Sequence, residues 1–227
     1  QPLAAVTREP PRWNPLVVIV TLTYTAYATA RPLVQTLAGG TESPRRTVTL
    51  EGVQNSCVLS LVTVVILAAL LMVRRDARLS DYGIHTRHWA RELAIGLFGF
   101  LASLLPVYIV LTCTLPWRNE ENQHVFLKFL KAHPDASTIG WVSLAVVVLA
   151  PMAEELQYRV VLQGWLRSVL PAKIAIPLVA VVFSVVHGFP DSLPLLPLAL
   201  VLGYVFEQRG SYLSVVSMHA LFNAWHL

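Results

Sequence analysis

The side chains that could do chemistry in this sequence lie in its last third, where they interrupt long apolar runs. They are two glutamates, an arginine, two histidines and an asparagine: Glu154, Glu155, Arg159, His187, His219 and Asn223. Ionisable groups are costly inside an apolar segment, so their presence there indicates a function. Glu155 and Arg159 are spaced i, i+4 with the glutamate first, which favours a structural ion pair. Glu154 is rotated by about 100° around the helix and stays the chemically available carboxylate.

Helix lengths predict that the carboxylate and one histidine lie at nearly equal depth. Pro171 separates two helical runs that form a hairpin. Glu154 lies about 24 Å of helix before this turn, and His187 lies about 22 Å after it. In the last run, His219 and Asn223 are spaced i, i+4 and share a face, about 14 and 20 Å from the preceding turn. We therefore expect these side chains to converge on one polar cavity.

A free carboxylate, two imidazoles and a carboxamide are suited to the hydrolysis of an amide bond inside a membrane. A carboxylate shielded from water is a competent general base near neutral pH, and a neighbouring histidine can orient the attacking water. A second histidine and the asparagine amide can donate to the developing oxyanion. Zinc held by Glu154, His187 and His219 would support the same reaction and stays open. A serine nucleophile at Ser184 or Ser217 is less favoured, because neither lies in a nucleophile motif.

The composition indicates a membrane protein. Hydrophobic residues make up 55% of the chain and charged residues only 13%, whereas an ordinary soluble domain has about 25% charged residues. This balance excludes soluble enzymes, disordered chains and small disulfide scaffolds. The net charge is +4, but the basic residues lie between apolar runs, which argues against a nucleic-acid partner. Cys57 and Cys113 match no metal or redox spacing and are interpreted as core packing residues rather than a disulfide.

The elements that must position the reactive side chains are helices. A membrane-spanning helix needs about 20 mostly apolar residues. Such runs predict an all-α, polytopic bundle of about seven spans: 16–37, 53–73, 93–115, 138–170, 173–187, 193–208 and 211–227. Apolar residues at helical spacing predict an interfacial helix within 120–133. The first fifteen residues lack the apolar core of a signal peptide.

Basic residues set the expected orientation, because they are enriched in cytoplasmic loops. The loop after the second run contains five arginines, and alternation of the spans puts ten basic residues on that side and five on the other. We therefore expect a multi-pass protein of the cell membrane with its N-terminus in the cytoplasm and its C-terminus outside.

Three short motifs resemble those of one protease family. The run from Glu154 to Arg159 is similar to the EExxxR motif of the CPBP (CAAX protease and bacteriocin-processing, Abi) family, which includes the Ras-converting CAAX proteases. Phe183 to His187 resembles its FxxxH motif, and His219 to Asn223 resembles its HxxxN motif. The resemblance covers about 138–227, and 1–137 are expected to form an N-terminal unit of spans. One departure is Val160, where many members have glycine.

The resemblance implies an endopeptidase in which Glu154 activates water with His187 as its partner. It implies that His219 and Asn223 stabilise the oxyanion and that Glu155 and Arg159 support the site. Both metal-dependent and glutamate mechanisms are argued for this family. We favour the glutamate type, which requires no cofactor, because the sequence contains no familiar zinc-ligand spacing.

The substrate implied by the resemblance is a membrane-associated or lipidated, CAAX-like protein or peptide, reached in contact with membrane lipid. The oligomeric state stays open. One alternative is a non-proteolytic scaffold or immunity protein that retains the motifs. A proton-relaying transporter ranks last, because transporters usually show two related halves and this sequence shows no such repeat.

Overall fold

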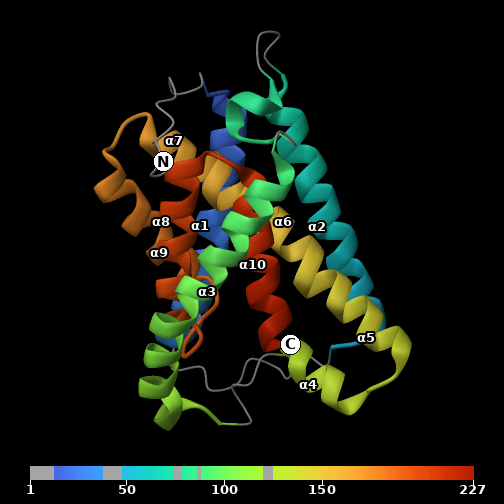
Figure 1. The fold of residues 1–227 in the computed structure, drawn as a ribbon. Coiled ribbons are helices and arrows are strands. Elements are labelled where there is room, and N and C mark those ends of the chain that lie inside the picture. The colour runs from blue at the N-terminus through green and yellow to red at the C-terminus, as the bar shows by residue number, and fades with distance from the viewer. Residues whose placement is uncertain (1–12, 38–47, 74–77, 86–87, 120–124) are drawn as a thin grey trace.

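The structure of the protein is a computed structural model that describes residues 13–37, 48–73, 78–85, 88–119 and 125–227. Within these ranges every regular element is a helix (Figure 1). The predicted all-α fold is therefore confirmed. Long apolar runs favour this outcome because a helix satisfies all of its backbone hydrogen bonds internally.

Long helical stretches in the described part of the chain follow the predicted apolar runs to within a few residues at most ends. They are α1 (Pro15–Leu37), α2 (Leu50–Leu71), α3 (Trp89–Thr114), the continuous run Ala136–Arg167, α8 (Ala172–Val185), α9 (Ser192–Arg209) and α10 (Tyr212–His226). Consecutive stretches run in opposite directions along the bundle (Figure 1). Shorter helices lie in two of the connections: η1 (Leu79–Tyr82), η2 (Leu115–Trp117) and α4 (Val125–Ala132).

The membrane topology is supported only in its coarser form. Three described helices are long and apolar enough to cross a membrane: Leu50–Leu71, Trp89–Trp117 and Ala136–Arg167. The apolar stretches Pro15–Ala30 and Ala172–Val185 are shorter. These helices indicate a membrane protein, whereas the number of seven spans, the cell membrane and the orientation stay predictions. Of the predicted interfacial helix, residues 120–124 lie outside the described residues.

The run Ala136–Arg167 contains two π-helical segments that the sequence does not indicate. It consists of α5 (Ala136–Ser143), η3 (Leu144–Leu149), α6 (Ala150–Glu155), η4 (Leu156–Gln163) and α7 (Gly164–Arg167), where η3 and η4 are π-helical. Such segments are rare and often occur at functional sites. An apolar run looks alike for an α-helix and a π-helix, so only the structure could show that α6 lies between two of them.

The run begins at Asp135, which caps it. The carboxylate accepts hydrogen bonds from the backbone N–H groups of Ser137 and Thr138, both at 3.0 Å, and from the Thr138 hydroxyl at 2.7 Å. Such a cap satisfies backbone donors that the first helical turn leaves free. Hydrogen bonding from the Thr138 side chain holds the pKa of Asp135 below its ordinary value, as expected when the charged form is the acceptor.

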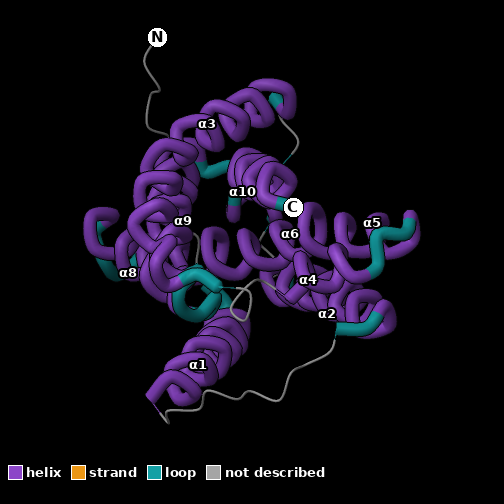
Figure 2. The backbone as a smooth tube through the Cα atoms, turned by 90° about the horizontal axis from the view of Figure 1, so that it is seen from below, coloured by secondary structure: helices purple, strands orange, loops and turns teal. Residues whose placement is uncertain are grey.

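The long helices pack around α6 and α10, which lie side by side (Figure 2). The main core cluster combines residues of the N-terminal helices, such as Val17 and Val107, with residues of the C-terminal ones, such as Leu202 and Met218. Gly96 lets α3 approach α10 closely, since a Cβ there would collide with the Ser217 hydroxyl. The division of the chain into 1–137 and 138–227 stays a prediction.

The two cysteines are free thiols. Cys57 is buried on α2 and lies 3.9 Å from the Trp141 carbonyl oxygen, which agrees with a packing role. Cys113 is exposed, so its interpretation as a core residue was wrong. It lies near the end of α3 on an outward face, where an apolar run has no neighbouring helix to cover it.

Candidate active site

The two adjacent glutamates of α6 have different environments. Glu155 is completely buried and forms the expected ion pair, with its Oε2 3.2 Å from Nε of Arg159. The side chain of Glu154 is 31% exposed. The rotation between neighbouring helix positions therefore separates a buried, paired carboxylate from an accessible one.

His219 on α10 connects these two carboxylates. Its Nδ1 lies 2.8 Å from Oε1 of Glu155, and its Nε2 lies 3.8 Å from Oε2 of Glu154. An ionised carboxylate can only accept hydrogen bonds, so Nδ1 carries the proton in the first contact. The opposite nitrogen, Nε2, therefore faces Glu154. The sequence predicted a pair of Glu155 with Arg159 but not the contact with His219.

His187 lies just beyond the end of α8, with its ring held by a residue of that helix. Its Nδ1 is 2.8 Å from the carbonyl oxygen of Phe183, which can only accept, so Nδ1 is the donor. The Nε2 atom is then free to accept a hydrogen bond from a substrate or a water. This is the tautomer that a partner of a general base requires.

Asn223 lies one helical turn after His219. Its Nδ2 donates to the carbonyl oxygen of Val146 at 2.8 Å. Val146 belongs to the π-helical segment η3. The bond fixes the amide plane against the neighbouring helix, and the carboxamide keeps a second N–H and its oxygen for other partners.

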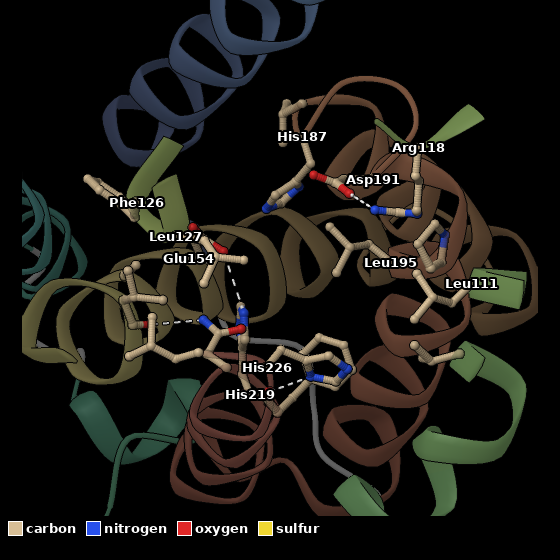
Figure 3. A pocket seen from close by; sticks show the side chains of 18 residues that line it. Leu111, Arg118, Phe126, Leu127, Glu154, His187, Asp191, Leu195, His219 and His226 are labelled. Carbon is tan, nitrogen blue, oxygen red and sulfur yellow. Dashed lines mark hydrogen bonds and ion pairs between the residues drawn. The ribbon is translucent and has the colours of Figure 1, made fainter. Parts of the chain in front are cut away.

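These four side chains line one cavity of about 570 Å³. Figure 3 shows Glu154 on α6, His187 after α8 and His219 on α10 turned toward the same space. Apolar side chains form much of the remaining wall, among them Val107, Leu111, Val186, Leu195 and Phe222. The predicted convergence of Glu154, His187, His219 and Asn223 on one cavity is therefore observed, while their catalytic roles stay predictions.

The Phe183 ring lies between the functional groups. It is 4.8 Å from the His187 ring and 5.8 Å from the His219 ring, measured between centroids. The guanidinium carbon of Arg159 lies 4.6 Å from the ring centroid, which is a cation–π contact. Phe183 is fully buried and packs both histidines and the buried cation. The sequence indicated it only through its spacing to His187.

Three further polar side chains of the wall were missed by the sequence analysis: Arg118, Asp191 and His226. Arg118 and Asp191 form an ion pair, with Nη1 and Oδ1 2.7 Å apart. His226 stacks on Tyr108, and its Nδ1 donates to the Phe222 carbonyl. The position of Asp191 in the break after His187 was a local signal, whereas nothing near Arg118 in the sequence points to the cavity.

Comparison with known proteins finds one family that matches the C-terminal part of the chain. Residues 136–225 match the family model described as Type II CAAX prenyl endopeptidase Rce1-like. This segment, which is less than half of the chain, is similar to the Rce1-like family. No curated protein matches the chain, and no solved structure matches it. The family is one of proteases, so the resemblance to the CAAX proteases is confirmed, and it supports an intramembrane protease in general terms.

The Rce1-like segment contains every residue of the three motifs, but it does not contain the whole cavity. Val107 and Leu111 on α3, Arg118 directly after η2, and Phe126 and Leu127 on α4 also line the cavity and lie outside the matched residues. The part of the chain before residue 136 therefore shapes the space in which the Rce1-like motif residues meet.

The serine alternative has no support in the geometry of the Rce1-like segment. The Ser184 hydroxyl donates to the Ala180 carbonyl at 2.8 Å, and the Ser217 hydroxyl donates to the Ser214 carbonyl at 3.0 Å. A hydroxyl has one proton to donate. Each serine uses that proton within its own helix, so neither is activated by a histidine.

The donor set of the Rce1-like site does not fit a zinc ion as arranged. Across the described ranges, no three His, Cys, Asp or Glu side chains lie close enough together to hold a metal. One nitrogen of His219 contacts Glu155 and one of His187 contacts a backbone carbonyl, so each ring keeps only Nε2 for another partner, as histidines at metal sites also do. The spacing of the donors is thus the observation against a bound ion as arranged. The expectation that no cofactor is required stays a prediction.

Proposed function

We propose that this protein is an intramembrane endopeptidase in which Glu154 activates a water for attack on a peptide carbonyl. The observation that carries the proposal is the shared cavity, which an accessible carboxylate, two histidines and an asparagine line together. The similarity of the matched segment to a protease family supports the same reaction class. In this proposal the His187 Nε2 accepts a hydrogen bond from the water and orients it.

The reaction needs one water and no other co-reactant. Glu154 takes a proton from the water as the oxygen forms a bond with the carbonyl carbon. The carbonyl oxygen becomes an oxyanion, which accepts hydrogen bonds from Asn223 and from His219 when that ring carries a proton on Nε2. The C–N bond then breaks, and Glu154 returns its proton to the leaving amine. The products are a carboxylic acid and an amine.

Glu155 and Arg159 support this chemistry without touching the substrate. The carboxylate of Glu155 accepts the Nδ1 proton of His219 at 2.8 Å and so orients the imidazole toward Glu154. Arg159 balances the charge of Glu155 within the buried core. A third group that orients a catalytic histidine in this way is a recurring feature of hydrolases.

The proposed substrate is a membrane-associated or lipidated peptide of the CAAX type. A cavity of about 570 Å³ with largely apolar walls accommodates a short hydrophobic peptide segment. The matched family is described as one of CAAX prenyl endopeptidases, which supports a lipidated substrate. Membrane lipid is a necessary neighbour of such a substrate.

The test is cleavage of a fluorogenic lipidated peptide by the purified protein in detergent. We expect Glu154→Gln to lower turnover by about 10²- to 10⁴-fold, because it removes the general base. Glu51→Gln is the matched control, since Glu51 is exposed in the first turn of α2. Undiminished cleavage by the Glu154 variant would contradict the proposal and favour a scaffold role.

His187→Ala extends the same test, and His133 provides its control. Both histidines contact the carbonyl four residues earlier through Nδ1, and both rings lie 4.8 Å from the phenylalanine at that position. His133 is exposed and lies outside the cavity lining. We expect the His187 variant to lose most of its turnover and the His133 variant to keep it.

A further inference from the structure

The ring of His187 is held on one side by Phe183, a residue of the preceding helix α8. His187 lies two residues beyond Val185, the last residue of α8, and a turn of residues 188–191 follows it. Gly188 has φ of 73°, a conformation that favours glycine, and there the chain leaves the helical direction. The position of the imidazole therefore depends on what holds this turn.

The segment that directly follows α3 contacts the turn through two neighbouring side chains, Trp117 at the end of η2 and Arg118 after it. The rings of Trp117 and Phe189 lie 5.6 Å apart between centroids. Nη1 of Arg118 lies 2.7 Å from Oδ1 of Asp191, beside His187 in the cavity wall (Figure 3). We call this pair of contacts the α3 clamp.

Arg118 and Asp191 both use their charged groups for this ion pair. Nε of Arg118 donates to the hydroxyl of Thr114, the last residue of α3, at 3.4 Å, which orients the guanidinium. Asp191 occupies the N-cap position of α9, yet its side chain makes no capping hydrogen bond there. The carboxylate therefore pairs with Arg118 and does not cap α9, although its position would favour a cap.

We propose that Trp117 and Arg118 are positioning residues, which hold the turn 188–191 and thereby place the His187 imidazole for catalysis. The inference rests on the proposed function, in which His187 orients the attacking water. Both residues lie outside the matched range 136–225. The part of the chain that the family match does not cover thus contributes to the geometry of the catalytic histidine.

The clamp should affect turnover more than stability. Partly exposed ion pairs contribute little to the stability of a fold, and the Arg118 and Asp191 side chains are 25% and 29% exposed. A misplacement of about 1 Å in a reacting group can lower a rate by about 10²-fold. We therefore expect loss of the clamp to lower kcat and to leave KM and the unfolding temperature little changed.

The chain contains a matched control for this pair. Arg167 and Glu207 form an ion pair of 2.9 Å between α7 and α9, with side chains 32% and 23% exposed. Neither residue lines the cavity. We expect Arg118→Gln to lower kcat by about tenfold or more, and Arg167→Gln to change it less than about twofold.

A charge exchange separates positioning from simple structural damage. The double variant Arg118→Asp, Asp191→Arg restores an ion pair of opposite polarity, so we expect it to recover kcat relative to either single variant. Equal kcat values for Arg118→Gln and Arg167→Gln would overturn the proposed positioning role of the clamp. A folded double variant that is no better than the single ones would overturn it as well.

Hydrogen exchange tests the clamp without any turnover. We expect the backbone amides of 187–192, apart from Pro190, to exchange faster in Arg118→Gln than in Arg167→Gln, because the turn loses its contact with Arg118. If Glu154→Gln cleaves as well as the unchanged protein, the proposed function is wrong. The exchange experiment still shows in that case whether Arg118 holds the turn 188–191. If Glu154→Gln is inactive but the exchange rates of the two arginine variants agree, only the clamp is wrong.

Discussion

Two buried glutamates each pair with an arginine and with a side chain of α10, yet only one of these α10 side chains lines the cavity. Glu92 on α3 lies 2.7 Å from Nη2 of Arg209 and accepts a hydrogen bond of 2.6 Å from the Ser214 hydroxyl. Glu155 pairs with Arg159 and with His219. The two clusters thus have the same composition of one carboxylate, one guanidinium and one donor from α10.

The difference lies in the α10 residue. The Ser214 hydroxyl has one proton, and its cluster ends at Glu92. His219 has a second ring nitrogen, which faces Glu154 and the cavity. A buried ion pair therefore supports a reaction only where one of its partners also reaches a space that a substrate can enter. The Glu92 cluster instead joins α3 to the turn between α9 and α10.

Among the tests of this contrast, the largest effect is expected for Glu155→Gln, which removes the carboxylate from the cluster that contains the cavity-lining His219. Loss of one partner of a buried ion pair costs about 3–5 kcal/mol, and loss of an oriented oxyanion donor lowers kcat by about 10²- to 10³-fold. We expect both losses, measured as the unfolding temperature in detergent and as turnover per folded molecule. A folded Glu155 variant with unchanged turnover would show that the two clusters do not differ in function.

Asn223→Ala tests whether α10 supplies a second donor at the cavity. We expect a decrease in kcat of about 10²-fold. Asn14 is the matched control, because its Nδ2 donates to the Leu70 carbonyl of another helix at 2.9 Å, similar to the bond from Asn223 to Val146. Asn14→Ala should lower stability and leave kcat unchanged, and equal effects of the two substitutions on kcat would argue against a donor role.

Glu92→Gln makes the corresponding change in the cluster remote from the cavity. We expect the free energy of unfolding to fall by about 3 kcal/mol, with turnover per folded molecule unchanged. Ser214→Ala, which removes only the neutral donor, should cost about 1 kcal/mol. A selective loss of kcat in the Glu92 variant, with its stability preserved, would remove the contrast between the clusters.

The smallest effect is expected for metal removal. Incubation with a strong chelator should leave cleavage unchanged, because the proposed mechanism uses only the side chains of the chain. The measurement is turnover before and after chelation, with zinc and magnesium added back separately. Loss of activity that zinc alone restores would contradict this prediction. It would imply that Glu154, His187 and His219 rearrange around the ion.

Features that depend on near neighbours in the chain could be predicted. The apolar runs predicted the long helices because their residues favour a helix wherever they are removed from water. The i, i+4 spacing predicted the pair of Glu155 with Arg159. Nearly equal helix lengths about Pro171 predicted that Glu154 and His187 lie at similar depth, and the two residues line one cavity. The π-helical segments and the exposure of Cys113 depend on neighbouring helices and were not predicted.

The sequence by itself determined an all-helical chain of apolar runs and the motif residues that the runs carry. Only the tertiary structure decided which distant residues join them. His219 meets Glu155 across 64 positions of the chain, Arg118 meets Asp191 across 73, and Arg209 meets Glu92 across 117. Such contacts depend on how whole helices pack, and packing fixes the relative rotation and depth of two helices in a way that spacing within either helix does not encode.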